Sequence, residues 1–228
     1  MDTTKPITIS TVYGPVRSWR VGMSLGIDLI RDTSVCSFNC VYCQLGNIQV
    51  VTNQRQLFVS TDQVARDFLA SRWRESDILT YSGSGEPTLA LNLGEVAREI
   101  GRITPIPQLV LTNGTRLDDP RVIQDLQAVQ RVYVKLDAAS EEMFQRVNRP
   151  ANGVTLASVV KHAKRFKKQY GGVFGIQVMF MPLNQNEADR LADLRRPKHL
   201  GVSEVRHHTP RDPAGRLIAH AHERGAVG

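Results

Sequence analysis

The sequence lacks the features that would argue against an ordinary globular domain. No run approaches the ~20 apolar residues that a membrane span requires, and the N-terminal MDTTKPITIS has no apolar core of the signal-peptide type. No internal repeat or low-complexity stretch is visible. The hydrophobic content of 41% and the charged content of 22% are ordinary, and 228 residues are enough for one domain with a substantial core. We therefore expect one domain with no membrane association.

Cysteine is scarce and unevenly distributed. The chain has three, Cys36, Cys40 and Cys43, and all fall within CSFNCVYC. An odd, crowded set argues against a disulfide framework and for a reducing compartment, so we expect a cytoplasmic protein. Three thiolates spaced C-x3-C-x2-C on one loop predict a soft metal centre and suit an iron–sulfur cluster. They leave one iron of a four-iron cubane open for chemistry. A structural zinc site completed by a distant histidine is the alternative.

Short apolar runs alternate with amphipathic helical windows along the chain. The predicted strands, rich in Val, Ile and Leu, are 24–30, 77–81, 108–112, 131–136, 173–180 and 202–206. The predicted helices are 61–72, 92–102, 119–128, 140–147, 154–170 and 185–195. Such alternation predicts a parallel sheet with right-handed crossovers. Six units are two fewer than a full eightfold barrel contains, so we expect an α/β fold with a (β/α)6 partial TIM barrel. A flat doubly wound sheet is the alternative.

Less regular segments flank this region. We expect an N-terminal extended segment over 1–23 that covers one mouth of the barrel, the barrel itself over 24–206, and a C-terminal tail over 207–228. The tail has no clear hydrophobic period and ends in small residues, so we expect it to be loosely ordered.

The cysteine loop follows the first barrel strand, at the carboxyl end where parallel barrels carry their chemistry. Together with an aromatic residue, Tyr42, before the last cysteine, it resembles the signature of the radical S-adenosylmethionine (SAM) superfamily, and the resemblance extends over about residues 10–205. It implies a partial barrel in which Cys36, Cys40 and Cys43 hold a [4Fe-4S] cluster. The amino and carboxylate groups of S-adenosyl-L-methionine would chelate the fourth iron. One-electron cleavage would then give a 5′-deoxyadenosyl radical that abstracts hydrogen from a substrate.

A glycine-rich turn, SGSGEPT, follows the second predicted strand. By itself it is a strand-to-helix turn or a weak phosphate-loop signal, because it lacks the residues of a nucleotide-binding loop. In this position Ser84, Gly85 and Glu86 resemble the superfamily's GGE motif. The resemblance implies that backbone carbonyls and the Glu86 side chain accept hydrogen bonds from the SAM ammonium. Glycine is expected because the ligand approaches the backbone closely.

Polar residues end the next two predicted strands. Asn113 lies in a TNG sequence that is common at this place in such enzymes, although Asn-Gly is also a plain turn signal. Lys135 and Asp137 are two residues apart, so both project from the same face of a strand. The resemblance places Lys135 at the SAM carboxylate and Asp137 at the ribose hydroxyls or the substrate. A solvent-facing ion pair is the alternative.

Basic residues give the chain a formal charge of +7. Part of this surplus lies on one predicted helix, at Lys161, Lys164, Arg165, Lys167 and Lys168. The simplest interpretation is a solvated face. The sharper hypotheses are docking of an acidic electron donor such as flavodoxin or ferredoxin, since complementary charge speeds encounter, and contact with the phosphates of RNA.

The run YGPVRSWRVGMSLGIDL resembles one branch of the superfamily, the Fe–S oxidoreductases related to tRNA wyosine-base synthases. Those synthases carry a second cluster on additional N-terminal cysteines, which this chain lacks before Cys36. The leading substrate class is a modified nucleoside or tRNA base, with tRNA as a candidate partner. The alternatives are an activase that places a radical on a protein glycine, and a non-catalytic iron–sulfur protein that binds a partner or carries electrons.

Overall fold

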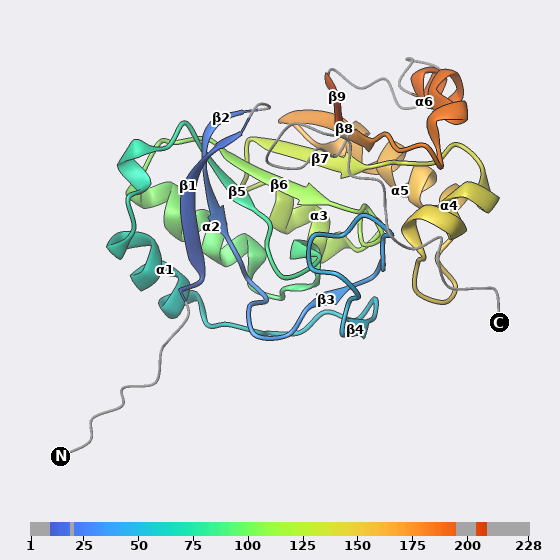
Figure 1. The fold of residues 1–228 in the computed structure, drawn as a ribbon. Coiled ribbons are helices and arrows are strands. Elements are labelled where there is room, and N and C mark those ends of the chain that lie inside the picture. The colour runs from blue at the N-terminus through green and yellow to red at the C-terminus, as the bar shows by residue number, and fades with distance from the viewer. Residues whose placement is uncertain (1–9, 19–20, 195–203, 209–228) are drawn as a thin grey trace.

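A curved seven-stranded sheet forms the centre of the protein (Figure 1). The structure, a computed structural model, describes residues 10–18, 21–194 and 204–208. Within them the sheet order is β1-β2-β5-β6-β7-β8-β9. The strands of this sheet are β1 (Val12–Ser18), β2 (Gly22–Ile27), β5 (Ile78–Tyr81), β6 (Gln108–Thr112), β7 (Arg131–Lys135), β8 (Val173–Met179) and β9 (Glu204–His208). All neighbours from β2 to β9 are parallel, whereas β1 pairs antiparallel to β2 at one edge.

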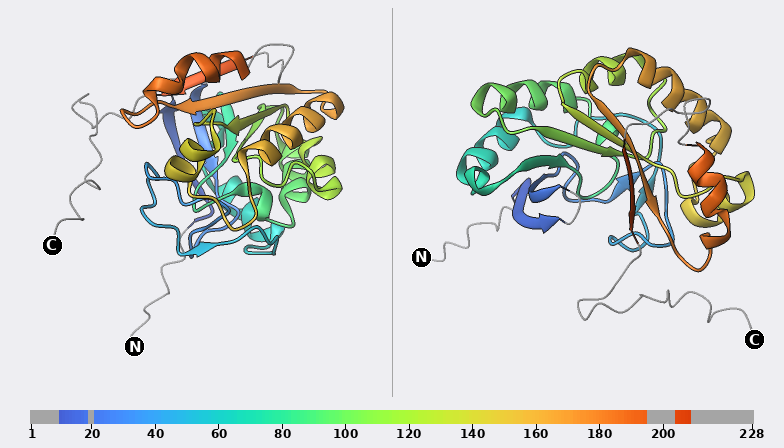
Figure 2. Two further views of the ribbon diagram at one scale, coloured as in Figure 1. Left: turned by 90° about the vertical axis from the view of Figure 1, so that its right-hand side faces the viewer. Right: turned by 90° about the horizontal axis from the view of Figure 1, so that it is seen from above.

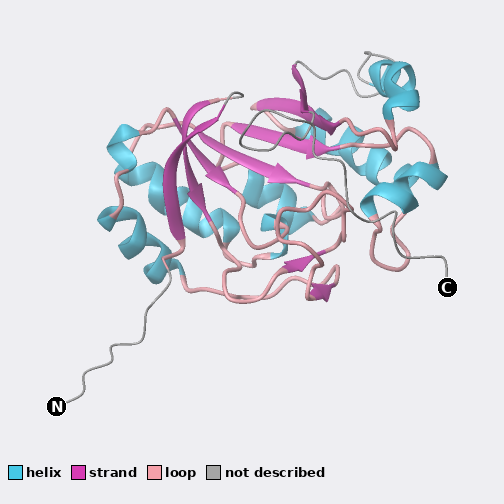
Figure 3. Cartoon of the chain, viewed as in Figure 1, coloured by secondary structure: helices cyan, strands magenta, loops and turns pink. Residues whose placement is uncertain are grey.

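Helices cover the convex side of the sheet, as the right-hand view of Figure 2 shows. They are α1 (Thr61–Ala70), α2 (Leu93–Ile103), α3 (Pro120–Leu126), α4 (Glu141–Asn148), α5 (Leu156–Gln169) and α6 (Ala188–Leu194). Short 3-10 turns lie at Trp73–Glu75, Pro87–Leu89 and Gln185–Glu187. The long loop after β2 carries two short strands, β3 (Val35–Cys36) and β4 (Val50–Val51), which pair with each other apart from the main sheet (Figure 3).

Alternation along each strand separates two faces. In β2, Leu25 and Ile27 are fully buried in the core between sheet and helices, whereas Ser24 and Gly26 line a cavity on the concave side. Side chains in successive positions of a strand point to opposite faces, so each barrel strand serves both the core and the cavity. The cavity therefore lies on the inner face of the same strands that build the hydrophobic core.

The six predicted parallel strands are confirmed, with small shifts in their bounds. β2 ends at Ile27 rather than at residue 30 because the Asp28 side chain accepts hydrogen bonds from the backbone N–H groups of Ile30 (2.9 Å) and Arg31 (3.1 Å), which turns the chain. β9 begins at Glu204, and the first two residues of the predicted strand 202–206 lie outside the described residues.

The N-terminal segment adds a strand that the sequence pattern did not predict. Residues Val12–Ser18 extend the sheet as β1, and several of their side chains line the cavity. Most of the predicted tail 207–228 lies outside the described residues, so the division at 1–23, 24–206 and 207–228 stays a prediction. Among the helices of the described ranges, none combines the length and apolar character that crossing a membrane needs.

Candidate metal and cofactor site

A cavity of about 760 Å³ opens on the concave side of the sheet, at the carboxyl ends of the strands. The three cysteines lie in its wall, as the motif predicts for the loop after β2. Every other residue predicted to bind the cofactor lines the same cavity except Asp137, which is completely buried beside it. The topology thus brings together residues that are spread over about a hundred positions of the chain.

The glycine-rich turn after β5 is joined to the start of the cysteine loop through backbone hydrogen bonds. The Val35 N–H donates to the Ser84 carbonyl (3.0 Å), and the Glu86 N–H donates to the Val35 carbonyl (3.0 Å). A Cβ atom on Gly85 would lie 1.8 Å from the Val35 carbonyl oxygen. Glycine is thus required here by the protein's own backbone, whereas the sequence analysis assigned that requirement to a ligand.

Amide N–H groups point at two of the cysteine sulfurs. The Asn113 Nδ2 lies 3.6 Å from Cys36 Sγ, which also accepts from the Phe38 backbone N–H at 3.4 Å. The Asn148 Nδ2 lies 3.5 Å from Cys40 Sγ. Donors of this kind stabilise negative charge on sulfur, and hydrogen bonds to sulfur help to set the reduction potential of iron–sulfur clusters.

The two cysteines that receive these donors are half-buried in the cavity wall. Burial raises the pKa of the Cys36 thiol, and the charge of Glu86 adds to the rise. Burial together with the charge of Asp137 raises the pKa of Cys40 to about 12. Both groups therefore hold their protons at neutral pH until a metal replaces them.

Zinc and an iron–sulfur cluster need different arrangements of the thiols. Among the residues with a described position, no three His, Cys, Asp or Glu side chains converge on the location of a single ion. One zinc ion gathers all its ligands onto one atom, whereas a cubane binds each thiolate through a different iron. The choice between the two metals rests on the family match reported below.

The Glu86 side chain joins the glycine-rich turn to the end of β6. Its carboxylate is buried and accepts hydrogen bonds from the Thr88 N–H (3.1 Å) and hydroxyl (2.6 Å), the Thr112 hydroxyl (2.7 Å) and the Asn113 N–H (2.7 Å). Burial nevertheless raises the pKa of Glu86, because these donors offset only part of the lost hydration. Three of these donors reach Oε1 and one reaches Oε2, so Oε2 keeps one acceptor site that no described residue fills.

Asp137 plays the same part on the opposite side. It is fully buried, and its carboxylate accepts from the Lys135 ammonium (2.9 Å), the Met179 N–H (2.7 Å) and the Asn148 amide (2.9 Å), as well as from the Tyr42 hydroxyl. The Lys135 Nζ also lies 4.9 Å from the centroid of the Tyr42 ring. The predicted pair of Lys135 and Asp137 therefore exists, but one partner is buried and the two are tied to the cysteine loop through Tyr42.

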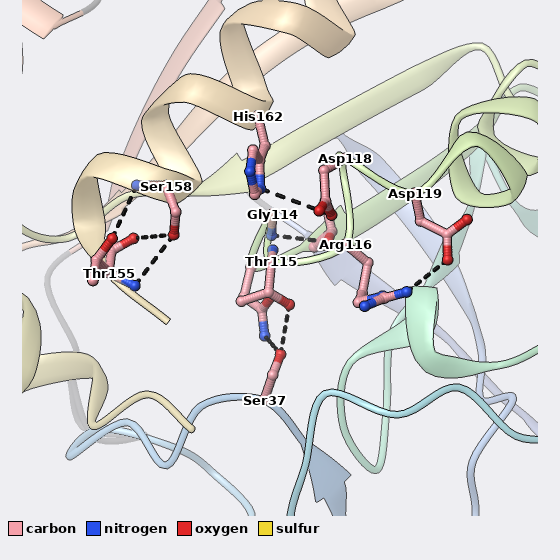
Figure 4. Close-up of polar contacts among 11 residues, drawn as sticks. Ser37, Gly114, Thr115, Arg116, Asp118, Asp119, Thr155, Ser158 and His162 are labelled. Atoms are coloured by element: carbon pink, nitrogen blue, oxygen red, sulfur yellow. Dashed lines mark hydrogen bonds and ion pairs between the residues drawn. The ribbon is translucent and has the colours of Figure 1, made fainter. Parts of the chain in front are cut away.

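A further contact joins the cysteine loop to the loop after β6. The hydroxyls of Ser37 and Thr115 lie 2.7 Å apart, as Figure 4 shows, and the Asn113 Nδ2 donates to Ser37 (2.8 Å). Asn113 thus lies where it can hold the loops and touch a cysteine sulfur at the same time.

Sequence reasoning missed three residues of this site: Asp28, Ser37 and Asn148. Asp28 Oδ2 accepts from the N–H (2.9 Å) and hydroxyl (2.6 Å) of Ser84, which fixes the glycine-rich turn against the end of β2. The sequence signal was an aspartate inside the predicted strand 24–30, because a carboxylate there is out of place in a strand buried on both faces. For Asn148, which reaches Cys40 from 108 positions away at the end of α4, no signal in the sequence exists.

Comparison with known proteins agrees with this geometry. A model of the Radical SAM superfamily matches residues 30–196. The chain is 43% identical over 195 residues to UPF0026 protein slr1464 of Synechocystis sp., covering 85% of this chain and 72% of that protein. It is 31% identical to a UPF0026 protein of Helicobacter pylori, covering 79% of this chain and 59% of that protein. A GTP 3′,8-cyclase of Marinobacter nauticus is 24% identical, over 81% of this chain and 54% of that protein.

Solved structures share the fold. TYW1 with a lysine–pyruvate adduct bound has a TM-score of 0.64 at 17% identity, over 84% of this chain and 67% of that chain. Native anSMEcpe with bound AdoMet has a TM-score of 0.60 at 19% identity, over 84% of this chain and 55% of that chain. These likenesses confirm the predicted partial barrel. They leave the predicted branch, related to wyosine-base synthases, as a prediction.

Proposed function

The chain belongs to the radical SAM superfamily of enzymes, and from this premise we propose that Cys36, Cys40 and Cys43 are the cluster ligands. Members of the family use a [4Fe-4S] cluster and SAM. When bound, these groups supply a one-electron cleavage of SAM and a 5′-deoxyadenosyl radical that removes hydrogen from a substrate. The observation that carries the proposal is the group of three separated thiols in the cavity wall, two of them with N–H donors.

We further propose that the residues around the thiols bind and orient SAM. The set is the one that the sequence predicted: Tyr42, Ser84, Gly85, Glu86, Asn113, Lys135 and Asp137. Because both oxygens of Asp137 are filled, this carboxylate acts by holding the loops in place. Glu86 holds the loops through Oε1 and keeps an acceptor site on Oε2 for the SAM ammonium. Lys135, whose side chain keeps 18% of its surface exposed, presents the cation for the SAM carboxylate. Glu86, Asn113 and Asp137 are buried, whereas Tyr42, Ser84, Gly85 and Lys135 are half-buried at the cavity, where a bound SAM would cover them.

The substrate that we propose is a modified nucleoside or a tRNA base, within the branch related to wyosine-base synthases. The resemblance of the run YGPVRSWRVGMSLGIDL to that branch supports this proposal. The family also requires a one-electron donor, for which flavodoxin or ferredoxin is proposed.

The basic face of α5 is a poor place for that donor. Lys167 and Lys168 lie in the last turn of α5, which ends at Gln169, and β8 begins shortly afterwards at Val173. They therefore lie at the amino-terminal ends of the strands, whereas the cysteines follow the carboxyl end of β2. We propose that the donor approaches the cysteine loop itself and that the α5 face is solvated.

The test is anaerobic reconstitution with iron and sulfide, followed by dithionite and SAM, with 5′-deoxyadenosine measured by chromatography. Wild type is expected to form the product and Cys40→Ala to form none, while Gln124→Met, on the exposed face of α3, serves as the matched control. A wild-type protein that holds its cluster yet forms no product under several reductants would refute catalysis and favour the non-catalytic iron–sulfur alternative. Comparison of bulk tRNA nucleosides with and without the protein then tests the substrate class.

A further inference from the structure

The wall of the cavity formed by β1 is shaped by a β-bulge. Tyr13 pairs with Gly26 and Val16 pairs with Ser24, so three steps along β1 match two along β2. Without the extra residue, positions three apart would face opposite sides of the strand. With it, Tyr13 and Val16 both line the cavity, with 43% and 53% of their surface exposed.

The ring of Tyr13 is held in place at this wall. A Cβ atom on Gly26 would lie 2.0 Å from Tyr13 Cζ, so the ring rests directly against the backbone of β2. Its hydroxyl is fixed by a 2.9 Å hydrogen bond with Ser82 at the end of β5. A large aromatic ring is thus positioned from one side and accessible from the other.

Gln177 presents an amide on the opposite flank of the sheet. It is 6% exposed and lines the cavity beside its parallel neighbour Lys135, while Ile176 and Val178 on either side of it face the core. Within the part of the chain that the structure describes, its side chain has no hydrogen-bond partner. The amide opens onto the cavity and offers one acceptor and two donors to a group that enters it.

The charged residues that line the cavity give no reason to expect a charged substrate. Among the described residues that line the cavity, the charged side chains are Asp28, Glu86 and Lys135. Asp28 is bonded to Ser84 and Glu86 to Thr112, while Lys135, paired with Asp137, is assigned above to the SAM carboxylate. Tyr13, Val16 and Gln177 form an uncharged wall of the cavity. This wall fits a flat, uncharged group that carries a hydrogen-bond donor next to an acceptor.

We propose that this uncharged wall is the substrate subsite and that it takes a nucleobase, an inference that rests on the function proposed above. The base stacks on the Tyr13 ring, and its edge pairs with the Gln177 amide, as glutamine pairs with adjacent donor and acceptor groups of bases elsewhere. A peptide amide could use Gln177 but would leave the aromatic ring without a stacking partner.

Direct binding tests the subsite without requiring turnover. The reconstituted protein, with saturating SAM so that the cofactor's own adenosine group fills its place, is dialysed anaerobically against adenosine, guanosine, cytidine, uridine or unfractionated tRNA. Wild type is expected to bind at least one of these probes. Gln177→Met should weaken that binding tenfold or more, and Tyr13→Leu should do the same, whereas Tyr13→Phe keeps the ring and most of the affinity. Gln124→Met is the matched glutamine control, and cluster absorbance checks that each variant is folded.

The outcomes separate this subsite from the catalytic proposal. Binding of a probe that depends on Gln177 and Tyr13 supports the subsite even if no 5′-deoxyadenosine forms, a result that would refute only catalysis. The subsite is refuted if folded wild type binds none of the probes, or if the variants bind them as tightly as wild type. It is also refuted if Gln177→Met weakens SAM binding and leaves probe binding intact, because the amide then belongs to the cofactor.

Discussion

The two walls of the cavity differ in how their polar groups are satisfied. One wall, called here the cysteine wall, consists of the cysteine loop and the strand ends packed against it. In it, Glu86 and Asp137 each accept four hydrogen bonds, and asparagine amides reach two sulfurs. At the uncharged wall, Gln177 is buried without a partner among the described residues and Tyr13 is half exposed. A preorganised wall suits a fixed cofactor, whereas an unsatisfied wall suits a group that arrives and leaves.

The largest effect on stability is expected at the centre of the cysteine wall. Asp137→Ala leaves Lys135 without its partner and removes an acceptor from Tyr42, so the free energy of unfolding should fall by about 3 kcal/mol. Asp118→Ala is the control, because Asp118 is 46% exposed and lies 3.8 Å from His162 (Figure 4). Urea unfolding of the apoprotein measures both. Equal losses for the two variants would contradict the conclusion that the buried Asp137 carboxylate ties these segments together.

A smaller loss is expected for Glu86→Gln, because the amide nitrogen cannot accept the hydrogen bonds of one carboxylate oxygen. The cost should be about 1–3 kcal/mol. The folded-state pKa of Glu86 is raised above 4.5, so its contribution is full below that pH and falls as pH rises through the folded pKa. The stability gap between wild type and variant should therefore narrow from pH 4 to pH 7. A gap that widens with pH would show that the carboxylate is stabilised when charged. Glu75→Gln, at the surface, is the control.

The amide donors should affect the cluster more than the fold. Asn148→Leu removes an N–H group that lies 3.5 Å from Cys40 Sγ. Such donors favour the more negative, reduced cluster, so its midpoint potential should fall by on the order of 40 mV, equivalent to about 1 kcal/mol for one electron. Anaerobic redox titration followed by electron paramagnetic resonance measures the change, with Gln124→Met for comparison. An unchanged potential would mean that Asn148 serves only Asp137.

The smallest effect on stability is expected at the uncharged wall. Gln177→Met replaces an unpaired amide with an apolar side chain of similar volume, so the free energy of unfolding should change by less than about 1.5 kcal/mol, with stabilisation as the expected direction. Thermal unfolding of the apoprotein is the measurement. A loss comparable to that of Asp137→Ala would show that Gln177 is structural, and the contrast between the two walls would disappear.

Much of the site was predictable because its signals are local. Cys36, Cys40 and Cys43 lie within one loop, and strand–helix alternation placed that loop, the glycine-rich turn and Lys135 at the carboxyl ends of parallel strands. The predicted elements agree with the structure because each depends on its own hydrophobic period. The strand β1 was missed because its pairing depends on an edge of the sheet rather than on its own pattern, which is polar and interrupted by Gly14 and Pro15.

By itself, the sequence determined that three thiols share one loop, that six strands alternate with helices, and that polar residues end those strands. Only the tertiary structure decided which groups meet: Val35 against Gly85, Asn148 at Cys40, Tyr13 over Gly26, and Gln177 with no partner among the described residues. The physical reason is the separation along the chain over which each effect acts. Hydrophobic period and ligand spacing act over a few residues, whereas hydrogen-bond partners are selected by strand register and loop packing between segments as many as 108 positions apart.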